Sequence, residues 1–158
     1  MKKWRKEILI HAPIEYVWPF FYGSLEKKKI IFPKVINEEF IHQTEQVVGS
    51  IIKQSYQIGS ITEHYEITIR KYTNEQNYKK FQENFLLNNR FRMTIDYELE
   101  SKNDTTTKFI YTSLNKPKNP LLSIFQLFGS DEVVQSFMER TKDSIEAAYK
   151  EEFQIDAL

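Results

Sequence analysis

The chain has 158 residues, of which 41% are hydrophobic, and its 22 Lys and Arg balance 22 Asp and Glu, so the formal net charge is zero. This length fits one domain over residues 1–158, and a neutral chain has no global field that would draw it to nucleic acid or anionic lipid. Cysteine is absent, which excludes disulfides, thiolate nucleophiles and cysteine metal sites. We therefore expect a cytoplasmic protein without a nucleic-acid partner.

The N-terminal part predicts a short strand followed by a helix. An apolar run at residues 8–10 lies behind a basic start, and it is too short for a signal peptide or a membrane span, so we expect no stable membrane insertion. Pro13 suits the first turn of a helix. The apolar side chains after it share one helical face, with one ring beside them: Val17, Phe20, Phe21 and Trp18.

A second short helix is expected at residues 24–30, ending before Pro33, because the residue that precedes a proline is disfavoured in a helix. From there the hydrophobic period changes to two, which is typical of strands. The strands are expected at residues 38–44, 51–58, 61–72, 78–84, 91–100 and 106–114. Gly59 and Ser60 indicate a two-residue hairpin, and Asn103 and Asp104 a second tight turn, so neighbouring strands should be antiparallel.

Alternation also assigns the faces of these strands. Odd positions of the strand at 91–100 are apolar and even positions are polar, so the odd ones should face the core. The same reasoning points Phe109 and Tyr111 inward on the last strand. The inward side chains expected on the other two strands are Phe91, Met93, Ile95, Tyr97 and Leu99, and Ile61, Tyr65, Ile67 and Ile69.

The C-terminal part predicts a long amphipathic helix. Apolar residues from Val133 to Tyr149 recur at helical spacing, with charged residues on the opposite side. Upstream, the apolar surface of residues 121–128 is broader than the single stripe that a helix needs to pack on a core. This segment could plug the open end of the sheet, cover a ligand as a lid, or contact a membrane or a partner.

Polar side chains that alternation places inside are candidates for a functional role. Glu83 shares parity with Phe81, and Glu63 with Tyr65, so either carboxylate could project into a cavity or instead lie at a strand end and reach water. A carboxylate inside would have a raised pKa and could act as a general base or anchor a ligand hydroxyl or amine. The inward tyrosines could bond a ligand or satisfy one another: Tyr56, Tyr97 and Tyr111.

The order strand, helices, six strands and long helix resembles the helix-grip fold of the START-like, Bet v 1-like (SRPBCC) superfamily, and within it the polyketide cyclase/dehydrase-type branch. The local matches lie at residues 10–18 (IHAPIEYVW), 48–50 (VGS) and 66–72 (EITIRKY). They are similar to the branch's Ala-Pro helix opening, its Val-Gly-Thr before the third strand, and the following strand with its tyrosine. The Gly-Trp motif of the Hsp90-activator-like branch is absent, since Trp4 and Trp18 are the only tryptophans.

The resemblance implies an α+β helix-grip fold: a curved seven-stranded antiparallel sheet wrapped around the C-terminal helix, with two short helices after the first strand and an internal apolar cavity. It implies no catalytic set, so no catalytic residue is assigned. Neither a cofactor nor a metal is expected, because His11, His42 and His64 are far apart in sequence. The expected cavity residues are Tyr56, Tyr65, Phe81, Glu83, Met93, Tyr97, Tyr111, Phe125, Phe137 and Met138.

Three functions remain open at this point. The first is a carrier or sensor that holds a lipid-like or other hydrophobic small molecule between the sheet and the helix. The second is a small cyclase, dehydratase or hydrolase that uses Glu83 or a tyrosine. The third is an interaction module built on residues 121–128, and a homodimer is left open as well.

Overall fold

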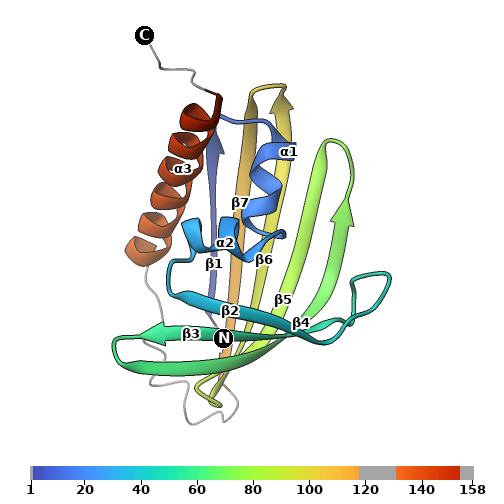
Figure 1. Cartoon of the computed structure of the whole chain (residues 1–158), viewed down its shortest axis with the longest axis vertical. Coiled ribbons are helices and arrows are strands. Elements are labelled where there is room, and N and C mark those ends of the chain that lie inside the picture. The colour runs from blue at the N-terminus through green and yellow to red at the C-terminus, as the bar shows by residue number, and fades with distance from the viewer. Residues whose placement is uncertain (1, 118–130, 154–158) are drawn as a thin grey trace.

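The computed structural model describes residues 2–117 and 131–153, which form one curved sheet and three helices (Figure 1). Three short helical segments follow the first strand, since a single 3₁₀ turn at Trp18–Phe20 lies between the first two helices. The elements in chain order are β1 (Lys2–Ile10), α1 (Ile14–Val17), α2 (Leu25–Ile31), β2 (Val35–His42), β3 (Ile51–Ile58), β4 (Ile61–Asn74), β5 (Tyr78–Leu87), β6 (Phe91–Asn103), β7 (Thr106–Pro117) and α3 (Asp131–Phe153).

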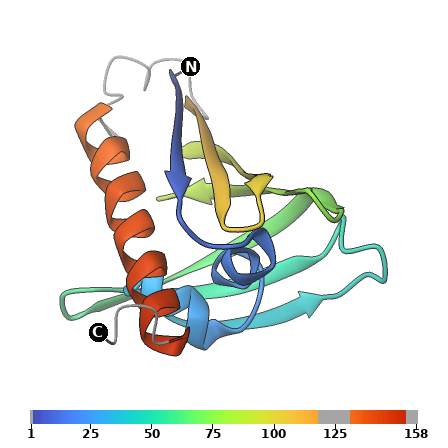
Figure 2. The same cartoon turned by 90° about the horizontal axis from the view of Figure 1, so that it is seen from above.

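The seven strands form one antiparallel sheet in the order β1-β7-β6-β5-β4-β3-β2. Only the first connection, from β1 to β2, crosses the sheet, and it contains α1 and α2. In the view from above the sheet curls around the helices and α3 lies along its open side (Figure 2). The α+β class, the antiparallel seven-stranded sheet and the long C-terminal helix predicted from the sequence are confirmed.

The two predicted hairpin turns are present. Ile58 pairs with Ile61 across a two-residue loop in which Gly59 has a φ of 61°, a backbone conformation that glycine adopts without strain. At the second turn, the Asn103 Oδ1 accepts a hydrogen bond of 2.9 Å from the Thr105 backbone N–H. Both turns join antiparallel neighbours, as the alternating pattern indicated.

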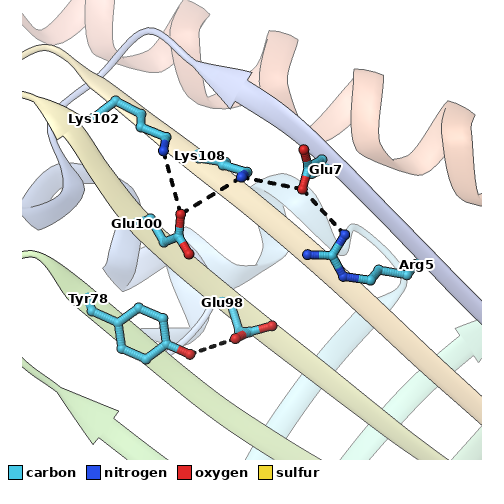
Figure 3. Close-up of polar contacts among 7 residues, drawn as sticks. All are labelled: Arg5, Glu7, Tyr78, Glu98, Glu100, Lys102 and Lys108. Carbon is cyan, nitrogen blue, oxygen red and sulfur yellow. Dashed lines mark hydrogen bonds and ion pairs between the residues drawn. The ribbon is translucent and has the colours of Figure 1, made fainter.

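The outer face of the sheet is polar. Lys108 lies between Glu7 and Glu100, at 3.4 and 3.9 Å, and thereby links β1, β7 and β6 (Figure 3). On the neighbouring strands the Tyr78 hydroxyl donates a hydrogen bond of 2.5 Å to Glu98 Oε1. These contacts confirm that the even positions of β6 face water, while its odd positions supply Ile95, Tyr97 and Leu99 to the core.

α3 is attached to the β1 edge by a polar cluster as well as by its apolar face. Lys142 Nζ donates hydrogen bonds to Glu146 Oε2 at 2.5 Å and to the backbone carbonyl of Leu9 at 3.0 Å. The same Glu146 oxygen accepts from the backbone N–H of His11 at 2.8 Å. These bonds fix the helix where β1 turns toward α1.

One end of the core is closely packed by aromatic rings. Trp18 and Tyr22 contact Phe81 at ring distances of 5.8 and 5.6 Å, and both lie beside Tyr72. Tyr72 faces inward because a bulge between Ile69 and Lys71 shifts the alternation of β4 by one residue. Space is therefore left only toward the other end of the sheet.

Two sequence expectations need correction. β1 is nine residues long rather than a three-residue run, because its backbone pairs with β7 from Lys2 to Ile10 whatever the hydrophobicity of its side chains. Ile61 was expected to point into the core but is 62% exposed. It lies at the tip of the β3–β4 hairpin, where the strands extend past the packed interior.

Candidate functional site

A groove of about 460 Å³ lies between the inner face of the sheet, the α2 region and the first half of α3. The volume is in the range of about 300–1,000 Å³ that small-molecule pockets occupy. Its lining comes from α2 and the residues that follow it, from strands β2 to β7 and from α3. The lining residues are Lys28, Ile31, Phe32, Pro33, Lys34, Val35, Gln54, Tyr56, Ile58, Tyr65, Glu83, Phe85, Leu87, Ile95, Tyr97, Tyr111, Val133, Val134, Phe137 and Arg140.

Aromatic rings form much of this wall. Phe137 of α3 stacks on Phe32 at 5.5 Å and meets Tyr111 at 5.4 Å, while Tyr97 contacts Tyr111 at 5.8 Å. Edge and offset contacts at these distances favour flat apolar partners. The groove therefore offers a surface that suits a hydrophobic, ring-bearing or chain-like molecule.

Glu83 is the acidic side chain of the wall. Its side chain faces the groove and is half-buried, although protein atoms surround it on the other sides. It accepts no hydrogen bond from the part of the chain that the structure describes. Burial raises the pKa of Glu83 to about 7, with Lys28 lowering the pKa and Glu38 raising it. Near neutral pH the carboxyl can therefore be an acid that donates or a carboxylate that accepts.

A buried ion pair lies beside Glu83. Lys28, with 7% of its surface exposed, donates from Nζ to both carboxylate oxygens of Glu38 at 2.8 and 3.0 Å. The Gln54 amide donates to the same carboxylate at 2.8 Å. The charges of Lys28 and Glu38 therefore balance each other, and their hydrogen bonds do not reach Glu83.

The tyrosine hydroxyls of the wall are held neutral. Burial raises the pKa of Tyr97, and the nearby Glu83 and Tyr111 raise it further. Burial also raises the pKa of Tyr111 to about 12, partly offset by a hydrogen bond with Ser113. At physiological pH these groups can donate or accept a hydrogen bond to a ligand but carry no charge.

The ten residues expected at a cavity divide into three groups. Phe81 and Met138 are buried in the core beside the groove, Met93 is half-buried and also outside its lining, and Phe125 lies outside the described residues. The structure brings together in the groove wall Tyr56, Tyr65, Glu83, Tyr97, Tyr111 and Phe137. That these residues bind a ligand stays a prediction.

Of the two carboxylates left open by the sequence, Glu83 lies in the groove wall. Glu63 accepts a short hydrogen bond from the Tyr65 hydroxyl and lines a second hollow instead. Three charged residues of the groove were not foreseen. They are Lys28, Lys34 and Arg140. For Lys28 a signal was present, because it precedes the buried Ile31 by three residues and so shares its helical face.

The second hollow, of about 530 Å³, lies where β4 separates from β5. The two strands pair from Thr68 and Asn84 onward, so the first half of β4 has β3 as its strand partner but not β5. Tyr65 and Phe85, with ring centres 5.9 Å apart, line both this hollow and the groove. These two rings therefore form the partition between the two spaces.

Neither a metal cluster nor a membrane span marks this site. Among the described residues no three His, Asp or Glu side chains gather in a way that could hold a metal ion. Within the same residues, no helix is long and apolar enough to cross a membrane.

Several solved structures resemble this chain in fold. Human STARD10 matches with a TM-score of 0.70 at 12% identity, covering 95% of this chain and 66% of that one. The di-domain ARO/CYC BexL from the BE-7585A biosynthetic pathway matches with a TM-score of 0.68 at 14% identity, covering 92% of this chain and 47% of that one. Norcoclaurine synthase from Thalictrum flavum, in complex with dopamine and hydroxybenzaldehyde, matches with a TM-score of 0.63 at 15% identity, covering 95% and 87%.

No family model matches the sequence, and a search of curated proteins finds no match. The solved structures nonetheless match over 92–95% of this chain. The chain therefore has a helix-grip fold similar to that of these solved structures. At these identities the likeness concerns the fold, and activity must be argued from the groove itself.

Proposed function

We propose that this protein is a carrier or sensor that holds a lipid-like or other hydrophobic small molecule in the groove between the sheet and α3. The observation that supports it is the contrast between the two ends of the core. Rings fill one end, whereas the other keeps a groove of about 460 Å³ lined mainly by apolar and aromatic side chains. Burial of apolar ligand surface, at about 25 cal/mol per Å², would drive binding.

The few polar groups of the wall would orient the ligand. Glu83 lacks a hydrogen-bond donor among the described residues and lies beside Tyr97 and Tyr111, so a ligand hydroxyl can bond to this group. The solved norcoclaurine synthase of the same fold holds dopamine and hydroxybenzaldehyde, two small aromatic molecules with hydroxyl groups. We place the protein in the cytoplasm, in keeping with its lack of cysteine.

Native mass spectrometry of freshly purified protein, followed by solvent extraction, tests the proposal. A stoichiometric adduct that leaves on denaturation supports a carrier and names the ligand class. If no adduct is seen, titration with the neutral hydrophobic fluorophore N-phenyl-1-naphthylamine provides the second measurement. Absence of both an adduct and saturable binding would contradict the proposal.

A groove-filling variant locates the binding site. Val134 lines the groove on α3, so Val134→Trp should reduce fluorophore binding by about tenfold or more, because the indole occupies space that the ligand needs. Ala147→Trp is the matched control, since Ala147 is exposed on the same helix and outside the groove. Equal loss of binding in both variants would show that the probe binds elsewhere.

An enzyme of cyclase, dehydratase or hydrolase type is the second candidate, and the pKa of Glu83 favours it. A carboxyl with a pKa of about 7 can accept and return a proton near neutral pH, which suits a general acid or base. Glu83→Gln separates the two functions, because it should leave hydrophobic binding nearly intact while abolishing any turnover of the extracted ligand.

A further inference from the structure

The charged residues that line the groove are Lys28, Lys34, Glu83 and Arg140. Lys28 is neutralised by its bidentate ion pair with Glu38. Lys34 and Arg140 form no ion pair with any residue in the ranges 2–117 and 131–153, and Arg140 does not pair with Glu139 or Asp143, its acidic neighbours on α3. The groove therefore has two cations whose charges no side chain of the described chain offsets.

Both cations line the groove together with Tyr56. The backbone carbonyl of Lys34 accepts a hydrogen bond of 2.8 Å from the Gln57 N–H, and Val35 pairs with Tyr56 across the β2–β3 ladder. From the other side, Arg140 of α3 acts on Tyr56, whose pKa burial raises and the guanidinium lowers. Two elements far apart in sequence thus bring positive charge to the same part of the groove.

This part of the groove is its exposed mouth. Lys34 and Arg140 are exposed, and the apolar residues Ile58 and Val133 beside them in the lining are 45% and 58% exposed. Glu83 by contrast lies deep, beside Tyr97. A molecule that fills the groove therefore meets a carboxyl group in its deep part and two cations where the groove is exposed.

The local charge differs from that of the whole chain, which is neutral. On the outer face of the sheet the lysines alternate with carboxylates, as Lys108 does between Glu7 and Glu100 (Figure 3). At the groove mouth the positive charges have no such partners within the described residues. An acidic group on a bound molecule would supply the missing partner.

We propose that the groove takes hydrophobic molecules that carry one acidic group, and that Lys34 and Arg140 bind this group beside the Tyr56 hydroxyl. The ligand class is an amphipathic monoanion, such as a fatty or polycyclic acid, whose apolar body lies among the aromatic rings. This inference rests on the proposed hydrophobic binding function and adds a specificity to it. Arg140 provides a planar fork that matches a carboxylate, and Lys34 a mobile point charge.

Two fluorophores with the same anilinonaphthalene body test the inference. N-Phenyl-1-naphthylamine is neutral, whereas 1-anilinonaphthalene-8-sulfonate carries one sulfonate. We expect both to bind and the sulfonate to bind about tenfold more tightly at low salt. This advantage should shrink as salt is added, because exposed charges are screened within about 10 Å at 0.1 M.

Charge-removing variants then identify the residues. Arg140→Gln and Lys34→Gln should each weaken sulfonate binding by about threefold to fivefold, in line with an exposed ion pair, and leave the neutral probe unchanged. Lys29→Gln is the matched control, because Lys29 is exposed on α2 and does not line the groove. Decanoate should displace the sulfonate at a several-fold lower concentration than decanol, which extends the result from sulfonates to carboxylates.

The outcomes separate this inference from the function on which it rests. Neutral binding with no preference for the sulfonate, or an equal effect of Arg140→Gln on both probes, would overturn the anion site and leave the carrier proposal standing. Failure of both probes, together with a clean apo mass, would overturn both. Since both substituted side chains are exposed, melting temperatures near that of the wild type are expected and confirm that the variants are folded.

Discussion

At the scale of single residues, Glu83 couples the groove to the stability of the protein. In the unfolded chain its carboxyl ionises near the ordinary pKa of 4.5, whereas in the folded chain burial raises the pKa to about 7. Between these two values the folded state binds more protons than the unfolded state. The free energy of unfolding contributed by this group therefore falls as the pH rises through this window.

Glu83→Gln should remove this pH dependence. The variant has no proton to lose, so at about pH 8 it should be more stable than the wild type, by an amount up to roughly 3 kcal/mol, and at about pH 5 the two should be nearly equal. Urea denaturation at both pH values measures the difference. Glu66→Gln, which replaces an exposed carboxylate on β4, is the control and should change stability little.

A wild-type protein whose stability relative to Glu83→Gln does not change between these pH values would contradict a buried, proton-binding Glu83. The same titration in the presence of a ligand reports whether the ligand contacts this carboxyl. A ligand that donates a hydrogen bond to the carboxylate should lower the pKa of Glu83 and reduce the slope.

At the scale of elements, the attachment of α3 depends on one carboxylate. Burial alone would raise the pKa of Glu146, but the hydrogen bonds from Lys142 and from the His11 backbone outweigh it, and the pKa is lowered. A lowered pKa means that Glu146 stabilises the fold above its ordinary pKa. That contribution is lost as the pH falls through the folded-state pKa.

Glu146→Gln should therefore destabilise the protein by about 1–2 kcal/mol at neutral pH, and the difference from the wild type should shrink in acid. Thermal unfolding at about pH 7 and about pH 3 checks both parts. Asp143→Asn, at an exposed position on the same helix, is the control and should change stability little. A constant difference at both pH values would mean that packing, rather than charge, explains the loss.

Elements with a regular period could be predicted from the sequence. Apolar and polar residues alternate in β6 without interruption, so the prediction of its inner face is confirmed. Glu83 of β5 also lies on the inner side of the sheet, as its parity with Phe81 indicated. The shift at Ile69 was not visible, because a bulge depends on the partner strand rather than on residue type. The C-terminal ends of β4 to β7 were underestimated for the same reason, since backbone pairing extends β7 to Pro117. The strand expected at residues 38–44 was placed too late, because β2 spans Val35–His42.

The charged part of the site could not be predicted, because it arises from contacts distant in sequence. Lys28 is buried only because Glu38 meets it from β2. Lys34 and Arg140 share a site because the sheet and α3 converge there, and each looks like an ordinary surface cation in the sequence. Six of the residues expected at a cavity line the groove, whereas the positions of Lys34 and Arg140 in it could not be predicted from the sequence.

At the scale of the whole molecule, the core has a closely packed end and a hollow end. Phe109 is fully buried and contacts Phe21 at 4.6 Å, whereas Phe137, 6.5 Å from Phe109, is half-buried and faces the groove. Phe109→Ala should cost about 4 kcal/mol, because it opens a new cavity. Phe137→Ala should cost about half as much, because it only widens a space that already exists.

Urea denaturation measures the two losses, and titration with the neutral fluorophore shows which variant changes binding. We expect Phe137→Ala to alter affinity and Phe109→Ala to leave it unchanged in protein that remains folded. The opposite ranking of the two stabilities would contradict the division between a packed end and a hollow end.

The separation of β4 from β5 has a consequence for the range of molecules that the groove accepts. β2, β3 and the first half of β4 form a wing of the sheet. The β4–β5 pairing from Thr68 onward joins this wing to the rest of the sheet, and the Lys28–Glu38 ion pair joins it to α2. Because the first half of β4 has no β5 partner, a change in the twist of this wing would alter the width of the groove while the β4–β5 ladder from Thr68 onward stays paired. If the groove binds a ligand as proposed, we expect its selectivity to come from the positions of the charged side chains rather than from the dimensions of the groove.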